Sequence, residues 1–242
     1  MRGRAISRTD RTALLVVVCA VLAGPAGAKP AASGVIVSKR AKSDFALTAD
    51  PQAAPWKGVP AVIADKDRFG EPVPNHRTEI RSRWTEGNLY LLYVAPYEEL
   101  NLKADPSTTA ETNKLWDWDV AEAFIGTDFK DIKKYKEFQV SPQGEWVDLA
   151  IDRGTNPPTH DVSWNSGYEV KARLDKDKHV WYGEMKIPMA SLGIRPKAGL
   201  RERINLYRCQ GPTATRKYIN WQPVNNETFH TPEAFGRLRL AN

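Results

Sequence analysis

The chain has 242 residues, of which 41% are hydrophobic, 10% aromatic and 26% charged, and its formal net charge is +6. This composition excludes a disordered or collagen-like chain, and the length fits one large domain or at most two small ones. Two cysteines are too few for a disulfide scaffold, whereas the eight tryptophans are numerous for a chain of this length.

Residues 1–28 have the pattern of a cleaved secretory signal peptide. Four arginines precede the apolar run 13–24, and the small residues 26–28 supply a cleavage site. The apolar run is too short to cross a bilayer core of about 30 Å, and an uncleaved anchor is the alternative. Cleavage leaves Cys209 as the single cysteine of a secreted or periplasmic chain, with a net charge of only +3. That charge gives no argument for a nucleic-acid partner, and we expect no membrane span in the mature chain.

A flexible lead-in and a series of short strands follow in chain order. Residues 29–43 are basic and rich in small side chains, so we expect them to be flexible. Period-two alternation then predicts strands, which are 78–84, 89–95, 120–125, 135–141, 145–152, 168–174, 180–187, 203–209, 218–221 and 236–240. The one helical turn that the sequence predicts is 189–192.

Turn residues join six of these strands into three hairpins, with turns at 86–88, 142–144 and 175–179. Three long connections remain, at 50–76, 96–114 and 153–167. Short strands at this spacing predict an all-β fold, a single antiparallel β-sandwich of immunoglobulin-like or jelly-roll-like type with long loops. We expect one domain over residues 44–242.

Residues that could carry catalysis are sparse. The sequence has no G-x-S-x-G nucleophile motif, and its four histidines are not at zinc-ligand spacing. A glycosidase needs two carboxylates that lie about 5–10 Å apart. The candidates in this sequence are Asp117, Asp119, Glu122 and Glu137. Asp119 and Glu122 are separated by an odd number of residues, so they point to opposite faces of a strand. We therefore expect a protein that is not an enzyme, with these acids solvated or at a cation site.

Two tryptophans lie at loop edges beside polar residues. Trp116 ends a long polar loop, and Trp221 precedes Gln222 and an Asn-rich stretch at 224–227. Sugars present apolar C–H faces and polar edges, which flat aromatic rings and planar polar groups match. Tryptophans inside alternating strands belong instead to the core, and these are Trp84, Trp146 and Trp181.

Three stretches together resemble the carbohydrate-binding module family 9-like domains, which are part of the wider DOMON-like group of β-sandwiches. The stretches are LWDWDVAEAFI at 115–125, YKEFQVSPQG at 135–144 followed by Trp146 and Asp148, and a C-terminal set at 205–208, 221–223 and 229–236. The resemblance extends from Asp44 to Leu240. It implies a β-sandwich that binds the end of a saccharide between two tryptophans.

Residue by residue, the resemblance implies that Trp116 is one stacking wall and Trp221 the other. It implies that Glu122 accepts hydrogen bonds from sugar hydroxyls. Asn205 and Arg208 match the C-terminal signature, although their odd spacing places them on opposite faces of a strand. Some family members bind structural calcium, but no tight acidic loop in this sequence supports a calcium site, so we expect no cofactor.

These observations predict an exported, non-catalytic carbohydrate-binding domain. Its partner would be an oligo- or polysaccharide, and its role accessory to xylan- or cellulose-type breakdown by glycoside hydrolases in carbohydrate catabolism. One alternative is a structural or envelope-interaction protein with a degenerate sugar site. Another is a haem-binding, DOMON-type electron-transfer domain, for which Met185, Met189, His179 or His230 would have to provide the axial ligands.

Overall fold

The structure is a computed structural model that describes Met1 and residues 34–242. Apart from Met1, the predicted signal peptide 1–28 lies outside the described residues, as does the first part of the predicted lead-in. Among the residues that are described, none forms a helix with the length and apolarity needed to cross a bilayer.

Strands and short 3-10 turns make up the described part of the chain. The strands are β1 (Val35–Arg40), β2 (Ala61–Ala64), β3 (Thr78–Trp84), β4 (Asn88–Pro96), β5 (Val120–Gly126), β6 (Lys134–Val140), β7 (Trp146–Asp152), β8 (Thr159–Asp161), β9 (Glu169–Asp175), β10 (Val180–Pro188), β11 (Arg201–Gln210), β12 (Lys217–Asn220) and β13 (Gly236–Ala241). The 3-10 turns are η1 (Ala54–Trp56), η2 (Leu115–Asp117), η3 (Met189–Leu192), η4 (Thr213–Thr215) and η5 (Pro232–Ala234).

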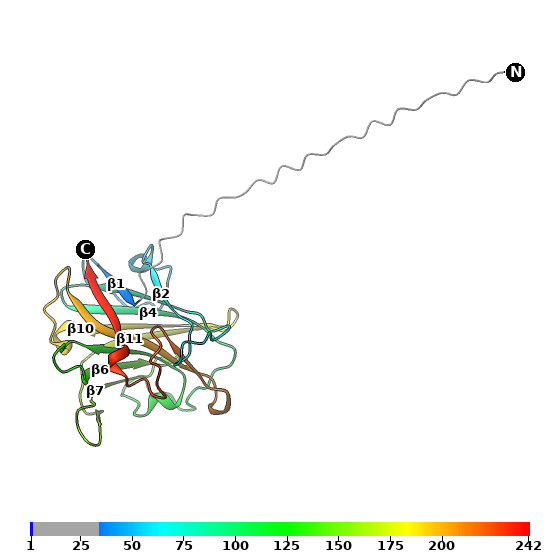
Figure 1. The fold of residues 1–242 in the computed structure, drawn as a ribbon. Helices are drawn as coiled ribbons and strands as arrows, with labels where there is room; N and C mark the ends of the chain where they lie inside the picture. The colour runs from blue at the N-terminus through cyan, green and yellow to red at the C-terminus, as the bar shows by residue number, and fades with distance from the viewer. Residues whose placement is uncertain (2–33) are drawn as a thin grey trace.

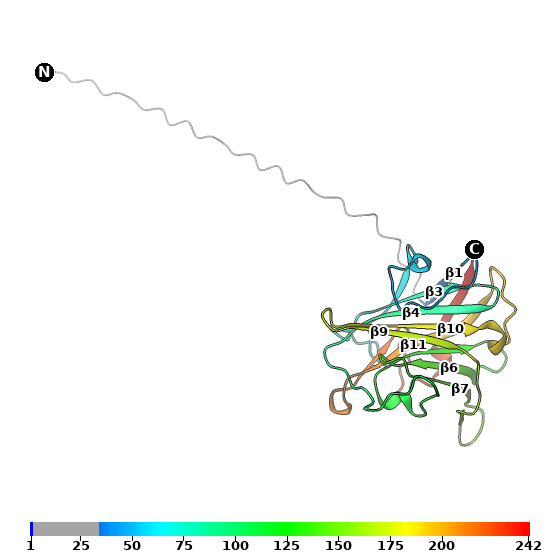
Figure 2. The ribbon, with the colours of Figure 1, turned by 180° about the vertical axis from the view of Figure 1, so that it is seen from behind.

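All the strands belong to one sheet, whose main path runs β8-β7-β6-β5-β11-β13-β1-β3-β4-β10-β9, with β12 beside β11 and β2 beside β3. The sheet curls so that its two ends face each other, because β10 and β9 also contact β6. Figures 1 and 2 show the result, a sandwich-like body with β4 and β10 above β6 and β7. The all-β, sandwich-like prediction is confirmed.

The three predicted hairpins are present as the pairs β3–β4, β6–β7 and β9–β10.

The structure differs from the sequence prediction at residues 35–40. They form β1 inside the predicted lead-in, and β1 pairs in parallel with both β13 and β3, so the sheet is not wholly antiparallel. Two short strands, β2 and β8, also lie within connections that we expected to be loops.

The inner core fills the space between the two halves of the curled sheet. Strand β4 gives it every second side chain from Leu89 to Ala95, as period-two alternation requires. Across from β4, the opposite half gives Ala121, Ala123, Phe138 and Leu206. Trp84 and Trp181 are fully buried here and Trp146 packs against the cluster, so the core role predicted for these three is confirmed.

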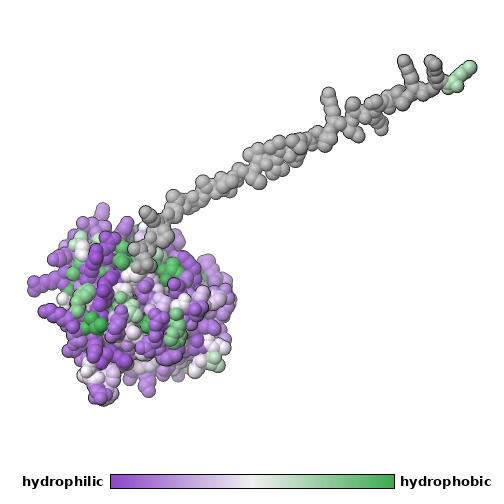
Figure 3. Space-filling model, viewed as in Figure 1, coloured by the Kyte–Doolittle hydropathy of each residue, from purple (hydrophilic) through white to green (hydrophobic). Residues whose placement is uncertain are grey.

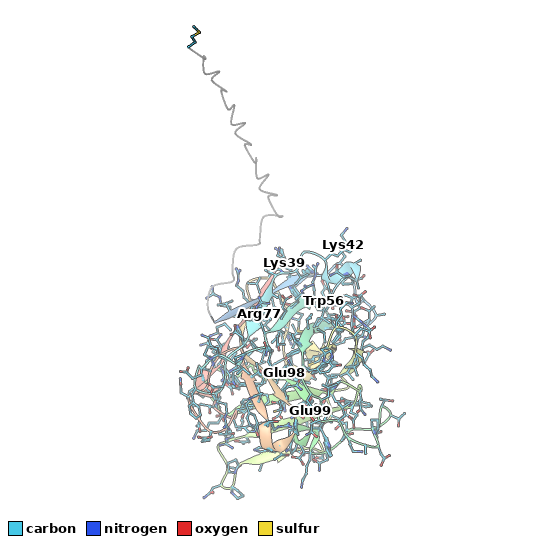
Figure 4. The ribbon with its side chains drawn as sticks, turned by 90° about the vertical axis from the view of Figure 1, so that its right-hand side faces the viewer. Lys39, Lys42, Trp56, Arg77, Glu98 and Glu99 are labelled. Atoms are coloured by element: carbon cyan, nitrogen blue, oxygen red, sulfur yellow. The ribbon has the colours of Figure 1, made fainter. Side chains whose placement is uncertain are left out.

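A segment at 44–59 covers the outer face of β4 and β10. Glu184 on β10 accepts hydrogen bonds from the backbone N–H groups of Thr48 and Ala49 and from the indole N–H of Trp56. Trp56, labelled in Figure 4, is therefore buried beneath this segment against Tyr90. The outer face of the other half, formed by β5, β6, β7 and β11, carries a separate cluster of aromatic and acidic side chains.

Candidate functional site: a cavity on the outer face of β5, β6 and β11

A cavity of about 630 Å³ opens over the outer face of β5, β6 and β11. This volume is typical of sites for small molecules, which fill roughly 300–1,000 Å³. The lining residues are Arg68, Trp116, Asp117, Glu122, Phe124, Glu137, His160, Cys209, Thr213, Arg216, Tyr218, Glu227, Thr228, Phe229 and His230. They come from five strands, β5, β6, β8, β11 and β12, and from the loops beside them, and β5, β6 and β11 form the floor.

One wall is Trp116, held by the 3-10 turn η2. The chain enters this turn through Lys114 in a left-handed conformation, with φ of 60°. The guanidinium of Arg216 donates hydrogen bonds of 2.6 Å to the backbone carbonyls of Trp116 and Trp118. The indole of Trp116 is half-buried against the outer cluster while the turn around it is fixed by these bonds. Arg216 is therefore a positioning residue for this wall.

Two further aromatic rings, Tyr218 and Phe229, line the cavity. Phe229 stacks on the buried ring of Tyr207, with 4.2 Å between ring centroids and 10° between the planes. Tyr218 on β12 meets Phe229 edge to face at 5.7 Å. The guanidinium of Arg68 lies 4.6 Å from the centre of the Tyr218 ring and pairs with Glu227 at the mouth of the cavity. The cavity thus has flat apolar surfaces on more than one side.

The floor holds two carboxylates on adjacent strands. Glu122 pairs with Gln139 in the β5–β6 ladder and Glu137 with Phe124, so both acids point to the outer face. They are only 2% and 4% exposed. The amide of Gln139 donates to Oε1 of Glu137 at 2.6 Å, while Oε2 of Glu137 has no hydrogen-bond partner among the described residues.

Burial makes ionisation of these two acids costly. It raises the pKa of Glu122 to about 7. Burial, with the neighbouring charge of Glu122, raises the pKa of Glu137 well above its usual range. The thiol of Cys209 lies 3.9 Å from Oε1 of Glu122, and burial raises the pKa of this thiol as well. At neutral pH the floor therefore offers both hydroxyl donors and carboxylate acceptors.

Histidines close the side of the cavity next to Glu137. The ring of His230 stacks on Phe124, hydrogen-bonds through Nδ1 to the hydroxyl of Tyr135 at 2.7 Å, and places Nε2 4.0 Å from Oε2 of Glu137. Burial lowers the pKa of His230 to about 3, so the ring is neutral and forms no ion pair with Glu137. His160 packs against it at 4.5 Å.

The structure brings Trp116 and Glu122 together in this cavity but places Trp221 elsewhere. Tyr218 faces outward from β12, so Trp221, three residues later, faces the inner core. There its ring lies against Gly236, where a Cβ atom would come within 2.7 Å of the indole. A clamp made by Trp116 and Trp221 is therefore not formed, and Tyr218 and Phe229 stand where a second wall was expected.

Asn205 and Arg208, on opposite faces of β11, are both buried away from the cavity. The amide of Asn205 donates to the backbone carbonyl of Gln222 and its oxygen accepts from the N–H of the same residue, at 2.9 and 3.2 Å. Arg208 is fully buried in the inner core and donates to Thr78 Oγ1 and to the carbonyl of Pro96. Asn205 therefore holds the segment after β12 to the sheet, and Arg208 connects β11 to the ends of β3 and β4.

The remaining candidates do not converge on one site. Asp119 is buried and accepts hydrogen bonds from the backbone of Gly211 and the amide of Gln210, so it ties two loops together. For the haem alternative, Met185 and Met189 lie in the inner core, on the other side of the sheet from His230. Among residues 34–242, no three His, Cys, Asp or Glu side chains are grouped to hold a metal ion, so we derive no role for calcium.

Sequence reasoning did not select Glu137, Tyr218, Phe229 and Arg216 as site residues. Phe229 belongs to the C-terminal stretch 229–236 that carries the family resemblance, but the resemblance implies no ligand contact for it. Glu137 is a candidate only for a catalytic carboxylate. Alternation along β6 is one signal that could have identified Glu137. Glu137 and Gln139 alternate with the apolar Phe138, so they point to the opposite face of the sheet from the core, on the strand that follows β5 directly. The positions of Tyr218 and Arg216 depend on contacts across the sheet, which the sequence alone does not reveal.

A protein-family model and a curated relative are similar in sequence to this chain. A model of the family described as "Carbohydrate family 9 binding domain-like" matches residues 53–242. A protein of Arthroderma benhamiae named "Extracellular protein" is 24% identical over 198 residues, covering 76% of this chain and 86% of that protein.

Two solved structures of a carbohydrate binding module family 9 protein from Caldicellulosiruptor kristjanssonii share the fold. The complex with cellotriose has a TM-score of 0.62 and 16% identity, covering 86% of this chain and 94% of that chain. The complex with glucose has a TM-score of 0.63 and 15% identity, covering 86% and 96%.

Proposed function

The chain belongs to the carbohydrate family 9 binding domain-like family, and from this premise we propose that the outer-face cavity binds a saccharide. The observation that carries the proposal is the pairing of aromatic walls with a buried acidic floor. Trp116, Tyr218 and Phe229 offer flat surfaces to the C–H faces of a sugar, and Glu122 and Glu137 offer oxygens to its hydroxyls. This also agrees with the sequence resemblance, which the family match confirms.

The ligand in this proposal is an uncharged sugar of the gluco- or xylo-oligosaccharide type. The solved family 9 module of Caldicellulosiruptor kristjanssonii is described with cellotriose and with glucose, and this supports such a ligand. A sugar hydroxyl would donate to Oε2 of Glu137, the buried oxygen that no described protein group satisfies. Trp116 is the stacking wall, and Tyr218 with Phe229 takes the place of the second tryptophan.

Calorimetric titration with glucose, cellotriose and xylotriose tests the proposal. The wild-type protein should bind at least one of them, and Trp116→Ala should weaken binding about tenfold or more because a stacking surface is lost. Trp164→Ala is the matched control, since Trp164 is also half-buried but does not line the cavity. No heat from any sugar with wild-type protein, or equal loss in both variants, would reject the cavity as a saccharide site.

We propose further that the domain acts by binding alone, as an accessory to enzymes that degrade xylan- or cellulose-type polysaccharides. The aromatic walls and the family support a binding role. Purified protein should release no reducing sugar from xylan or cellulose but should co-sediment with at least one of them. Release of reducing sugar that Glu122→Gln abolishes would instead make the floor acids catalytic.

Export is the last part of the proposed function. The signal-peptide pattern at 1–28 supports it, as does similarity to a relative named "Extracellular protein". N-terminal sequencing of the protein recovered from outside the cytoplasm should show that the mature chain begins at Lys29. Recovery of the full-length chain only in the cytoplasm would contradict export.

A further inference from the structure

Four arginines stand side by side on the outer face of β11 and β13. The antiparallel register pairs Arg201 with Arg239 and Arg203 with Arg237. Directly opposed side chains in such a ladder have Cβ atoms about 5 Å apart, and like charges in this position destabilise the sheet. Two successive pairs of this kind therefore carry an electrostatic cost.

The arginine face, which comprises Arg201, Arg203, Arg237 and Arg239, carries more positive than ion-paired charge within the described residues. Over residues 34–242 none of the four forms a salt bridge, although basic residues elsewhere in the chain do. Arg203 is buried and donates to the backbone carbonyls of Asp128 and Ile132, so it fixes that loop and adds charge without being accessible. Arg201, Arg237 and Arg239 are exposed.

The surroundings extend the face and add some negative charge, since Asp128, Glu202 and Glu233 act on Arg203. Strand β1 runs beside β13 and presents the half-buried Val35 and Val37, followed by the exposed Lys39 that Figure 4 labels. In Figure 1 the red C-terminal strand crosses the front of the molecule, and Figure 3, in the same view, shows hydrophilic side chains gathered along it. Because β11 and β13 are adjacent, the arginines form two successive pairs along the sheet, in which Arg201, Arg237 and Arg239 are exposed.

An exposed aromatic ring lies at the end of this row. Phe129 is 50% exposed, although large apolar side chains are normally covered. The guanidinium carbons of Arg203 and Arg237 lie 6.0 and 5.6 Å from its ring centre. Phe129 thus combines an apolar platform with cationic groups at its side.

We propose that the arginine face, together with Phe129, is a second binding surface and that it takes an acidic polysaccharide chain. Exposed guanidinium groups bind carboxylates through paired hydrogen bonds, and successive outward positions on a strand repeat every ~7 Å. This spacing gives a row of anion contacts along an extended polymer. The C–H face of one sugar packs on Phe129, which a purely ionic partner would not use. The surface shares no lining residue with the saccharide cavity, so the proposal is independent of the function proposed for it.

Affinity electrophoresis in polygalacturonate gels, with neutral dextran gels as reference, tests the inference. The polygalacturonate should retard the wild-type protein, and the retardation should decrease as salt is raised from about 25 to about 200 mM. The double variant Arg237→Gln/Arg239→Gln should lose about tenfold or more in affinity. Lys57→Gln/Lys176→Gln is the matched control, because it removes the same charge from two exposed positions elsewhere and should change affinity less than about twofold.

Several results would overturn the inference. One is the absence of retardation of the wild-type protein at low salt. A second is equal loss in the two double variants, which would mean that binding follows net charge alone. Stronger binding to phosphatidylglycerol vesicles than to polygalacturonate would identify a membrane surface as the partner. Loss of retardation in Trp116→Ala would place the polymer in the cavity instead, whereas failure of neutral sugars to bind that cavity leaves this proposal untouched.

Discussion

Replacing Glu122 by glutamine should change how the stability of the protein depends on pH. Burial raises the pKa of Glu122 from 4.5 to about 7. In the unfolded chain this carboxyl ionises near its ordinary pKa, whereas in the folded chain it stays protonated until the higher pH. The contribution of Glu122 to stability therefore decreases as pH rises from about 4.5 to about 7 and then stays constant.

The size of this loss follows from the two pKa values. Each pKa unit corresponds to about 1.4 kcal/mol, so wild type should lose about 3 kcal/mol of unfolding free energy through Glu122 across this range. The glutamine side chain keeps the shape of the floor but has no proton to lose. Glu122→Gln should therefore match wild type near pH 4.5 and exceed its stability by up to about 3 kcal/mol near pH 8.

Urea unfolding followed by tryptophan fluorescence, repeated from about pH 4.5 to about pH 8.5, measures this difference. Glu71→Gln is the matched control, because Glu71 is exposed and its removal should leave the wild-type pH profile intact. Parallel profiles for wild type and Glu122→Gln would refute the reasoning, since they would mean that the Glu122 carboxyl ionises alike in both states.

Three further substitutions test how the fold supports the site. Gly236→Ala should cost about 1–3 kcal/mol of stability in urea unfolding, because its methyl group would lie 2.7 Å from the Trp221 ring, and unchanged stability would contradict that packing. Arg208→Leu should cost about 3 kcal/mol by the same measurement, because buried hydrogen-bond acceptors lose their donor. Arg216→Gln should weaken saccharide binding in calorimetry by releasing the Trp116 turn, while a Trp116→Ala background should show little additional loss.

The strands and hairpins could be predicted because their causes are local. Alternation of apolar and polar residues marks each strand, and the turn residues between them set the pairing, as at 142–144 between β6 and β7. Closure of the sheet could not be predicted in the same way, because it depends on contacts between β6 and β10, which are distant in sequence. For the same reason the sequence predicts a flexible segment where β1 forms, because β1 pairs with β13, which lies at the other end of the chain.

The candidate site shows a similar division. Trp116 and Glu122 are close in sequence, so their convergence needed only the short turn before β5 and the alternation along that strand. Alternation also predicts that Tyr218 and Trp221 face opposite ways, but it does not say which face carries the cavity. That choice is made by tertiary packing, where the inner core takes the larger tryptophan and Tyr218 is left facing outward over Cys209.

Charge separates the two surfaces on the outer face of β11. The first half of the strand carries Arg201 and Arg203, and the second half contributes Cys209 to the acidic cavity. A carboxylate ligand entering the cavity would lose its water beside a buried floor on which burial keeps Glu137 protonated and uncharged. A neutral sugar avoids this cost, and the exposed arginines offer an acidic polymer counter-charges in addition to Arg68 and Arg216, which line the cavity. The segment containing Phe229 and Phe235 covers the strand between the two surfaces, with Phe235 5.7 Å from the Arg203 guanidinium and Phe229 at the cavity. The two proposed binding surfaces therefore lie at opposite ends of one strand, and each can be tested without disturbing the other.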